Sequence, residues 1–358
     1  MKLNRKQLLE ALSSAVCVID KKSPVPIVSN VLVNASLGSV EVVATDLRST
    51  VATVVTVDDP IGFCANAGEL LAIVGGLSHD EITITVDESR LKIVGGGAKF
   101  TMAVDNPKDF PAVPSFDTSK AKEMDASAIA SAILGTSYAV SYDRPHISGV
   151  FVTTINGALE AVATDGQRMA VRKVKVDESV FSKAVIPTGA ANSMAKILAG
   201  LATCSVCIDK NVLQIRAGGS TMSTKLVESD FVPYEQFFGK GSWKKSPAVV
   251  NRAALLGALK RALIIRATDK TGIPFGDLNF SPDGIEIVRQ DQSSKIEETV
   301  ECSGASSYST HLNLRFVFEA VDHIIADEVE IHTDGDLDQV NIRDKSGEQV
   351  AVIMPARK

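Results

Sequence analysis

A nine-residue segment occurs twice in this chain, and this repeat limits the possible folds more than any other feature. The second copy is Ala163-Thr-Asp-Gly-Gln-Arg-Met-Ala-Val171, and a diverged first copy runs from Ala44 to Ala52. Each copy follows a stretch, at residues 39–43 and 158–162, whose side-chain character alternates along the chain as in a half-buried strand. The offset of 163 minus 44, or 119 residues, is the size of one domain. The repeat predicts duplicated domains, and three would fill the 358 residues.

The expected elements recur in the same order in each unit, with two helices and a majority of strands. Helical spacing of apolar residues and N-cap candidates such as Asn66 and Asn251 mark the helices. Alternating segments joined by short polar turns predict hairpins at 82–94, 206–215 and 329–342. The fold class is therefore α+β, with two helices packed on antiparallel sheets in each of three similar domains. The expected helices cover 4–15, 66–76, 126–138, 189–201, 251–266 and 312–325.

The composition is that of a globular protein from a reducing compartment. No apolar run reaches the roughly 18 residues of a membrane span. Glu10 interrupts the first apolar stretch, which favours an amphipathic helix over a signal peptide. The five cysteines are odd in number and scattered, which favours the cytoplasm. Cys204 and Cys207 form a lone Cys-x-x-Cys on an expected strand, without the second pair that zinc needs or the helix start that a redox pair needs.

No constellation of residues predicts catalysis. An enzyme would have to recruit acidic residues and histidines that match no metal-ligand or acid–base spacing: Asp46, Asp165, His311, His323, His332 and Asp334. The glycines at 95–97 join two strands, whereas a phosphate-binding loop would open a helix. Asp46 and Asp165 recur at the same place in the repeat, which favours a turn-capping role. We therefore expect no catalytic residue, metal or cofactor.

Charge is segregated by type of element. The net charge of −6 argues at first against nucleic acid. The six expected helices nevertheless carry eight basic and four acidic residues, a net of +4, so the remainder carries −10. A basic set on helices in an acidic protein suits a surface that faces a polyanion without reading its sequence. Aromatic residues make up 5% of the chain, so stacking on single-stranded bases is not indicated, which leaves contact with a duplex backbone.

Motifs along the whole chain resemble those of the bacterial DNA polymerase III beta subunit, the processivity sliding clamp. They include Pro26-Ile27, the segment 163–171 and Thr224-Lys-Leu-Val227. The ending Val352-Ile-Met-Pro-Ala-Arg357 completes the set. The resemblance implies the DNA clamp fold, with domains at 1–116, 122–240 and 246–358, in a head-to-tail homodimeric ring. Three domains in each of two chains close a pseudo-sixfold ring.

The function that the resemblance implies is non-enzymatic. The ring encircles duplex DNA and tethers its partners, which are the DNA polymerase III alpha subunit, the clamp loader and other proteins with a clamp-binding motif. Helices line the hole, and no membrane is involved. By position, Phe100 and Met102 of one chain face Ile264 and Ile265 of the next, with burial in their own domain as the alternative. The residues expected to face DNA are Arg5, Lys6, Lys22, Arg144, Lys196, Arg252, Lys260, Arg261 and Arg266.

Members of this family hold partner peptides in a cleft between the second and third domains. Met169 and Met354 would give an adaptable apolar floor. Gly166 would admit close backbone approach, and the arginines would hold polar groups at the rim. The residues carried over by position, with those where the chain departs from the usual pattern, are Ile147, Thr164, Gly166, Gln167, Arg168, Met169, Val232, Phe237, Val340, Val352, Met354, Pro355 and Arg357.

Two departures from the family pattern bear on peptide preference. Gln167 stands where a histidine is common, and Val232 stands where proline is expected. The alternative function is an acidic scaffold that binds proteins without encircling DNA. A clamp would stay on circular duplex DNA and slide off the ends of linear DNA, whereas the scaffold would not.

Overall fold

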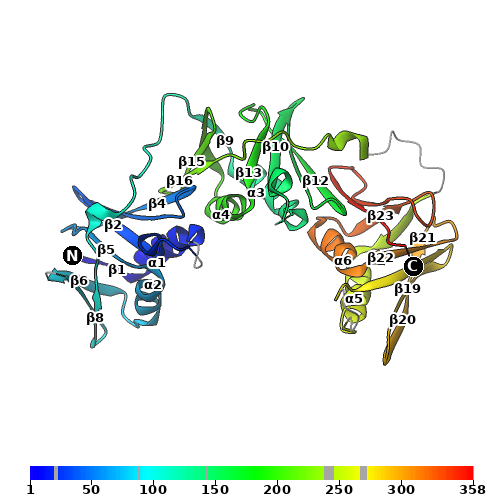
Figure 1. Cartoon of the computed structure of the whole chain (residues 1–358), viewed down its shortest axis with the longest axis horizontal. Coiled ribbons are helices and arrows are strands. Elements are labelled where there is room, and N and C mark those ends of the chain that lie inside the picture. Colours follow the sequence, from blue (N-terminus) through cyan, green and yellow to red (C-terminus); the bar gives the residue numbers. More distant parts are fainter. Residues whose placement is uncertain (20–22, 88, 142, 238–245, 267–271, 358) are drawn as a thin grey trace. The chain divides into compact units, whose positions relative to one another are not determined.

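The computed structural model describes residues 1–19, 23–87, 89–141, 143–237, 246–266 and 272–357 (Figure 1). Contacts divide the chain into two compact units. One unit comprises Met1–Ala130, Val176–Phe181 and Gly189–Glu228, and the other comprises Ser131–Lys175, Ser182–Thr188 and Ser229–Lys358. Both units are α+β, as the sequence predicts. The division into three domains stays a prediction.

The first unit contains an eight-stranded antiparallel sheet in the order β5-β2-β3-β4-β16-β15-β14-β9. Strands from two sequence repeats meet in it, because β4 pairs with β16 in the register Thr50 to Ser223. Ser49 and Thr224 share a hydroxyl hydrogen bond of 2.9 Å across this seam, and Thr53 and Ser220 share one of 2.8 Å. The strands are β2 (Asn30–Ser36), β3 (Ser39–Thr45), β4 (Ser49–Thr56), β5 (Phe63–Asn66), β9 (Lys122–Asp125), β14 (Thr203–Asp209), β15 (Val212–Ala217) and β16 (Ser220–Lys225).

A four-stranded sheet, β1-β6-β7-β8, completes the first unit together with helices α1 (Arg5–Ala15) and α2 (Ala67–Gly76), which pack against each other (Figure 1). Asn4 and Asn66 cap these helices through their side-chain oxygens, which confirms the cap predicted at Asn66. Leu8, Leu12 and Leu70 are fully buried. The strands are β1 (Lys2–Asn4), β6 (Glu81–Asp87), β7 (Arg90–Gly95) and β8 (Ala98–Ala103).

The second unit has a nine-stranded sheet, β13-β10-β11-β12-β25-β24-β23-β17-β21, and a four-stranded sheet, β20-β19-β18-β22. The last strand of the chain again closes the seam, because β12 pairs with β25 in the register Met169 to Val352. The strands are β10 (Gly149–Ile155), β11 (Ala158–Thr164), β12 (Arg168–Lys175), β13 (Ala184–Pro187), β17 (Ala248–Asn251), β18 (Phe275–Ser281), β19 (Gly284–Asp291), β20 (Ser294–Val300), β21 (Cys302–Ser303), β22 (Tyr308–Asn313), β23 (Glu328–His332), β24 (Val340–Arg343) and β25 (Gln349–Ile353).

Helices α5 (Arg252–Ala262) and α6 (Leu314–His323) pack side by side in the second unit, with Asn251 and Asn313 as N-caps (Figure 1). Of the other two helices, α4 (Thr188–Leu198) belongs to the first unit from Gly189 onward, and α3 (Ala126–Leu134) is divided between the units after Ala130. The predicted helix 126–138 was too long. Thr136 donates its hydroxyl to the carbonyls of Ala132 and Ile133, so the helix ends there and a 3-10 turn at Ser137–Ala139 follows.

The repeated segment forms the same turn in both units. The Asp46 carboxylate accepts the backbone N–H groups of Arg48 and Ser49, and the Asp165 carboxylate accepts those of Gln167 and Arg168. The preceding threonine of each copy also donates its hydroxyl to a backbone carbonyl across the turn. Both aspartates are therefore turn-capping residues, as predicted.

Candidate functional site

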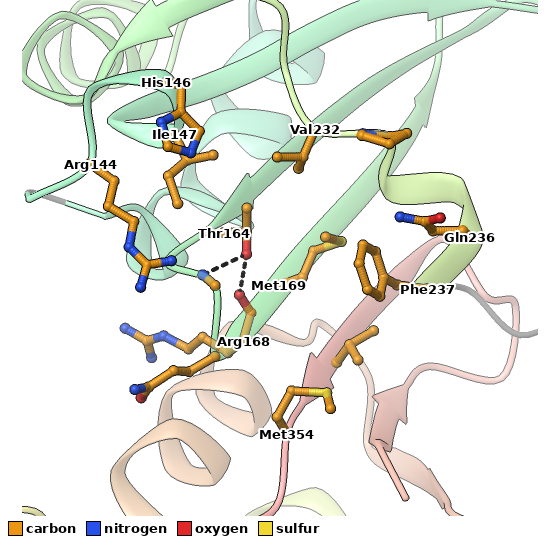
Figure 2. A pocket seen from close by; sticks show the side chains of 14 residues that line it. Arg144, His146, Ile147, Thr164, Arg168, Met169, Val232, Gln236, Phe237 and Met354 are labelled. Atoms are coloured by element: carbon orange, nitrogen blue, oxygen red, sulfur yellow. Dashed lines mark hydrogen bonds between the residues drawn. The ribbon is translucent and has the colours of Figure 1, made fainter.

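A pocket of about 260 Å³ lies in the second unit, where β12 and β25 pair (Figure 2). One wall is the segment that follows β11, and another is the segment from Val232 to Phe237. Ten of the predicted cleft residues line it: Ile147, Thr164, Gly166, Gln167, Arg168, Met169, Val232, Phe237, Val352 and Met354.

The middle of the pocket is apolar and deformable. Figure 2 shows Met169, Phe237 and Met354 around one hollow. Met169 is 6% exposed and forms part of the base, whereas Met354 is 48% exposed and Phe237 38%. Unbranched thioether side chains adapt to differently shaped apolar groups, and half-exposed apolar side chains gain free energy when a ligand covers them. The pocket therefore suits apolar anchors of more than one shape.

The turn at residues 164–167 forms one end of the pocket and depends on Gly166. Gly166 has a φ of +87°, and its N–H donates to the Thr164 hydroxyl at 3.1 Å (Figure 2). A β-carbon at this position would lie 2.5 Å from Nη1 of Arg144. The left-handed backbone favours glycine here, and a larger residue would also displace the end of the flexible Arg144 side chain. The Met354 N–H donates to the Gln167 carbonyl at 2.9 Å and joins this turn to the end of β25.

Arg168 lines the pocket, but its guanidinium is bound within the protein. Nε donates to Asp165 at 3.0 Å, Nη2 donates to the Tyr138 carbonyl at 2.6 Å, and Nη1 pairs with Glu319 of α6. The guanidinium carbon lies 4.2 Å from the centre of the Phe316 ring. The Arg168 side chain is only 11% exposed. Arg168 therefore anchors the turn to α6 and has few donors left for a ligand at the rim.

Three of the predicted cleft residues are not among those that line the pocket. Val340 is fully buried in β24, Pro355 is half-buried, and Arg357 is exposed. Sequence reasoning missed four lining residues: Arg144, which was assigned to DNA, and His146, Pro233 and Gln236. His146, Pro233 and Gln236 are each adjacent to a predicted cleft residue, so their position in the chain was the signal that could have found them.

The residues predicted for the subunit interface differ in exposure. On β8, the last strand of its sheet, Phe100 is 39% exposed and Met102 only 5%. Ile264 is 74% exposed and Ile265 is half-buried. Burial of Met102 agrees with the core alternative for that residue, whereas Phe100 and Ile264 are open.

The basic residues predicted to face DNA are also not equivalent. Arg252 donates to the carbonyls of Val321 and Asp322 at the end of α6, and Arg261 pairs with Glu298. Arg266 lies beyond the end of α5, and Lys22 lies outside the described residues. Arg5 is half-buried, and the exposed members of the set are Lys6, Arg144, Lys196, Lys260, Arg261 and Arg266.

The Cys-x-x-Cys lies on β14, as predicted. All five cysteines are free thiols, and burial raises the pKa of Cys204 to about 11. A thiol with so high a pKa is a poor nucleophile. Across the described ranges, no group of three or more His, Cys, Asp or Glu side chains could hold a metal ion, and no helix is long and apolar enough to cross a membrane.

Two family models match the chain over most of its length. Residues 1–114 match the N-terminal domain of the DNA polymerase III beta subunit, and residues 123–233 match its central domain. The chain belongs to the DNA polymerase III beta subunit family. This family is the sliding clamp of DNA replication, a processivity factor without catalytic activity of its own.

Curated relatives and solved structures agree with this membership. The chain is 24% identical to the beta sliding clamp of Pseudomonas putida, covering 92% of this chain and 91% of that protein. It is 23% identical to the beta sliding clamp of Escherichia coli, covering 99% of each. The structure of a Bartonella birtlesii DnaN sliding clamp bound to griselimycin matches with a TM-score of 0.89 and 24% identity, covering 100% of this chain and 99% of that one. The clamp fold predicted from the sequence is therefore confirmed.

Proposed function

We propose that this protein encircles duplex DNA as a head-to-tail homodimer and tethers the replicative polymerase through the pocket at Met169 and Met354. Family membership supports the clamp role. The pocket supports the tethering role, because its apolar base and half-exposed rim suit a short peptide with apolar anchors. The proposed partners are duplex DNA, a second copy of the chain, the DNA polymerase III alpha subunit, the clamp loader and other proteins with a clamp-binding motif.

The ring is proposed to close through two outermost strands. β8 is the last strand of its four-stranded sheet, and β20 is the last strand of another. Such edges carry unpaired backbone donors and acceptors that a second chain can pair. Phe100 on β8 and Ile264 after α5 supply exposed apolar surface for the same contact. A contact between different surfaces closes into a ring only when its rotation divides the circle, which two chains of three domains satisfy.

Contact with DNA is proposed to be weak and independent of the DNA sequence. The exposed Lys6, Lys196 and Lys260 are point charges on long side chains, which suit transient phosphate contacts. Tight contacts would prevent sliding, so retention comes from topology. We place the protein in the cytoplasm, since its five thiols are free.

The test is retention on DNA. The protein, loaded by a clamp loader onto nicked circular duplex, should stay through gel filtration and leave when the circle is cut. Lys260→Glu should lower the loaded fraction severalfold, whereas Lys345→Glu, in the turn between β24 and β25, should load normally. Equal loss from circular and linear DNA would favour an acidic scaffold that binds proteins only.

A further inference from the structure

A second pocket lies in the first unit and has no assigned role. It has a volume of about 440 Å³ and lies on the face of the eight-stranded sheet that the segment 111–121 crosses. Gln214 on β15 fixes this segment: its amide donates to the Ser115 carbonyl at 2.8 Å and accepts the Asp117 N–H at 3.3 Å. The pocket walls are therefore held in place by hydrogen bonds.

The two pockets overlap at equivalent strand positions of the repeated architecture. The first lies at the seam where Met169 of β12 faces Val352 of β25, and the second lies where Thr50 of β4 faces Ser223 of β16. Each pair of strands follows a copy of the repeated turn. Each pocket also has a wall made by the segment after an Asp-Phe pair, Asp109-Phe110 for the second pocket and Asp230-Phe231 for the first. The turn that forms one end of the first pocket, residues 164–167, has no counterpart among the residues that line the second pocket, so the two pockets share the paired strands and the wall segment only.

The chemistry of the second pocket differs at these equivalent positions. The second pocket has the hydroxyl side chains of Thr50 and Ser223 at the positions that Met169 and Val352 occupy in the first pocket. The second pocket also contains two charged residues, Glu41 on β3 and Arg216 on β15. A ligand of the second pocket must therefore be more polar than a ligand of the first.

Arg216 is held in a fixed position with donors left over. Its guanidinium carbon lies 4.2 Å from the centre of the Phe116 ring, and Nε donates to the Thr221 hydroxyl at 3.2 Å. Among the described residues, no carboxylate lies within 4.0 Å of it, unlike Arg168 of the first pocket, which is paired with both Asp165 and Glu319. A stacked guanidinium with both terminal nitrogens available is preorganised to bind a carboxylate through two parallel hydrogen bonds.

Glu41 lies on the same face of the sheet but well apart from Arg216. The strands β4 and β16 separate β3 from β15, so the two side chains start three strand spacings apart, roughly 15 Å with the offset along the strands. This separation exceeds the Debye length of about 8 Å at physiological ionic strength, so Glu41 repels an anion at Arg216 only weakly. An extended peptide covers roughly 15 Å in four to five residues.

We propose that this second pocket binds an extended peptide of a partner protein, with an acidic side chain at Arg216 and a basic side chain four to five residues away at Glu41. The choice of a peptide rests on the proposed peptide role of the first pocket, whereas the charge pattern rests on Arg216 and Glu41 alone. Partners of the two pockets would differ, because one pocket selects apolar anchors and the other selects a pair of opposite charges.

A peptide selection on the full-length chain tests the proposal. Random twelve-residue peptides displayed on phage are selected on the unmodified protein and depleted on Arg216→Gln. We expect enriched peptides with an acidic and a basic residue four to five positions apart. Synthesised with a fluorescent label, they should lose at least tenfold in affinity for Arg216→Gln and severalfold for Glu41→Gln. Arg48→Gln, an exposed arginine of the same unit outside the pocket, should leave the affinity unchanged.

A polymerase-derived peptide serves as the second ligand in the same assay. It should bind unmodified protein and Arg216→Gln equally and should not compete with the selected peptides. The proposal fails if no peptide depends on Arg216, or if the selected peptides compete with the polymerase peptide. If only the polymerase-derived peptide fails to bind, the proposed function of the first pocket is contradicted. The role of the second pocket is still decided by whether binding of the selected peptides depends on Arg216.

Discussion

At the scale of single residues, Met354 combines exposure with a place at the centre of the first pocket. Its side chain is 48% exposed, so a substitution disturbs the core little. Met354→Glu should lower the affinity for a polymerase-derived peptide by tenfold or more. Covering the exposed half of a methionine contributes roughly 1 kcal/mol, covering a carboxylate instead adds a desolvation cost, and 1.4 kcal/mol corresponds to tenfold. Fluorescence anisotropy with labelled peptide measures this. Leu337→Glu, at a residue 63% exposed and outside the pocket, is the matched control.

Arg168 and Glu319 show how a residue outside the pocket can position it. Glu319 lies on α6, is not among the lining residues, and pairs with the guanidinium that anchors the turn. Glu319→Gln should weaken peptide binding severalfold, since a hydrogen bond to a charged group contributes about 1.5–3 kcal/mol. A double-mutant cycle with Arg168→Lys should show that the two effects are not additive. Asp322→Asn on the same helix should not change the peptide affinity, and additive effects would contradict the coupling.

At the scale of elements, the repeated turn accommodates different residues at its left-handed position. Gly166 has a φ of +87°, and Leu47 of the first copy has a φ of +73°. Gly166→Ala should destabilise the second unit by about 1 kcal/mol or more, because L-residues are strained in this region. The melting temperature should fall by a few degrees and the peptide affinity should fall with it. Gly189→Ala, in the first turn of α4 with open space around it, should leave both unchanged or raise the stability.

The hairpin of β23 and β24 contains a buried histidine beside two partly exposed charged residues, and this cluster links stability to pH. His332 is 4% exposed, and its Nε2 lies 3.1 Å from the Glu330 carboxylate, which accepts a hydrogen bond of 3.0 Å from Nε of Arg343 and forms an ion pair of 3.0 Å with Nη2. Burial lowers the pKa of His332 below its ordinary value of 6.5. Burial also opposes the Glu330 carboxylate, but its hydrogen bonds with His332 and Arg343 hold its pKa below the ordinary value.

The lowered pKa values of His332 and Glu330 both make the folded state less stable as the pH falls. A depressed pKa means that the unfolded chain binds protons first as the pH falls, so the folded state loses stability. The stability that His332 contributes is complete above pH 6.5 and is lost on acidification. His332→Gln should reduce the drop in melting temperature between pH 7.5 and pH 5.5. An identical drop in the variant and the unmodified protein would contradict this assignment.

At the scale of the whole molecule, assembly should depend on the exposed apolar residues of the proposed interface. Phe100→Glu and Ile264→Glu should each shift the solution mass from twice 37.9 kDa to 37.9 kDa at micromolar concentration, because each would bury a charge against apolar surface. Light scattering after gel filtration measures the mass. Leu37→Glu, at a fully exposed hairpin residue, is the control. A dimer that survives both substitutions would place the interface elsewhere.

Local sequence patterns determined the fold class and most elements. Alternation predicted the hairpins, because one face of each strand is buried, and asparagine caps marked helix starts, because a side chain can satisfy the free N–H groups of the first turn. The repeated Thr-Asp predicted its own turn for the same local reason. The resemblance added ten residues that do line the pocket.

Only the tertiary structure decided which of these side chains are available. Arg168 reads as a rim cation in the sequence, yet it is bound to Asp165, Tyr138 and Glu319, and the last two are distant in the chain. Val340 reads as a cleft residue, yet it is fully buried. No sequence motif includes Arg216. Only the structure shows that β15 places its guanidinium over the Phe116 ring. The burial and the ion pairing of a side chain depend on residues from distant parts of the chain that pack around it. A local sequence pattern therefore does not predict them.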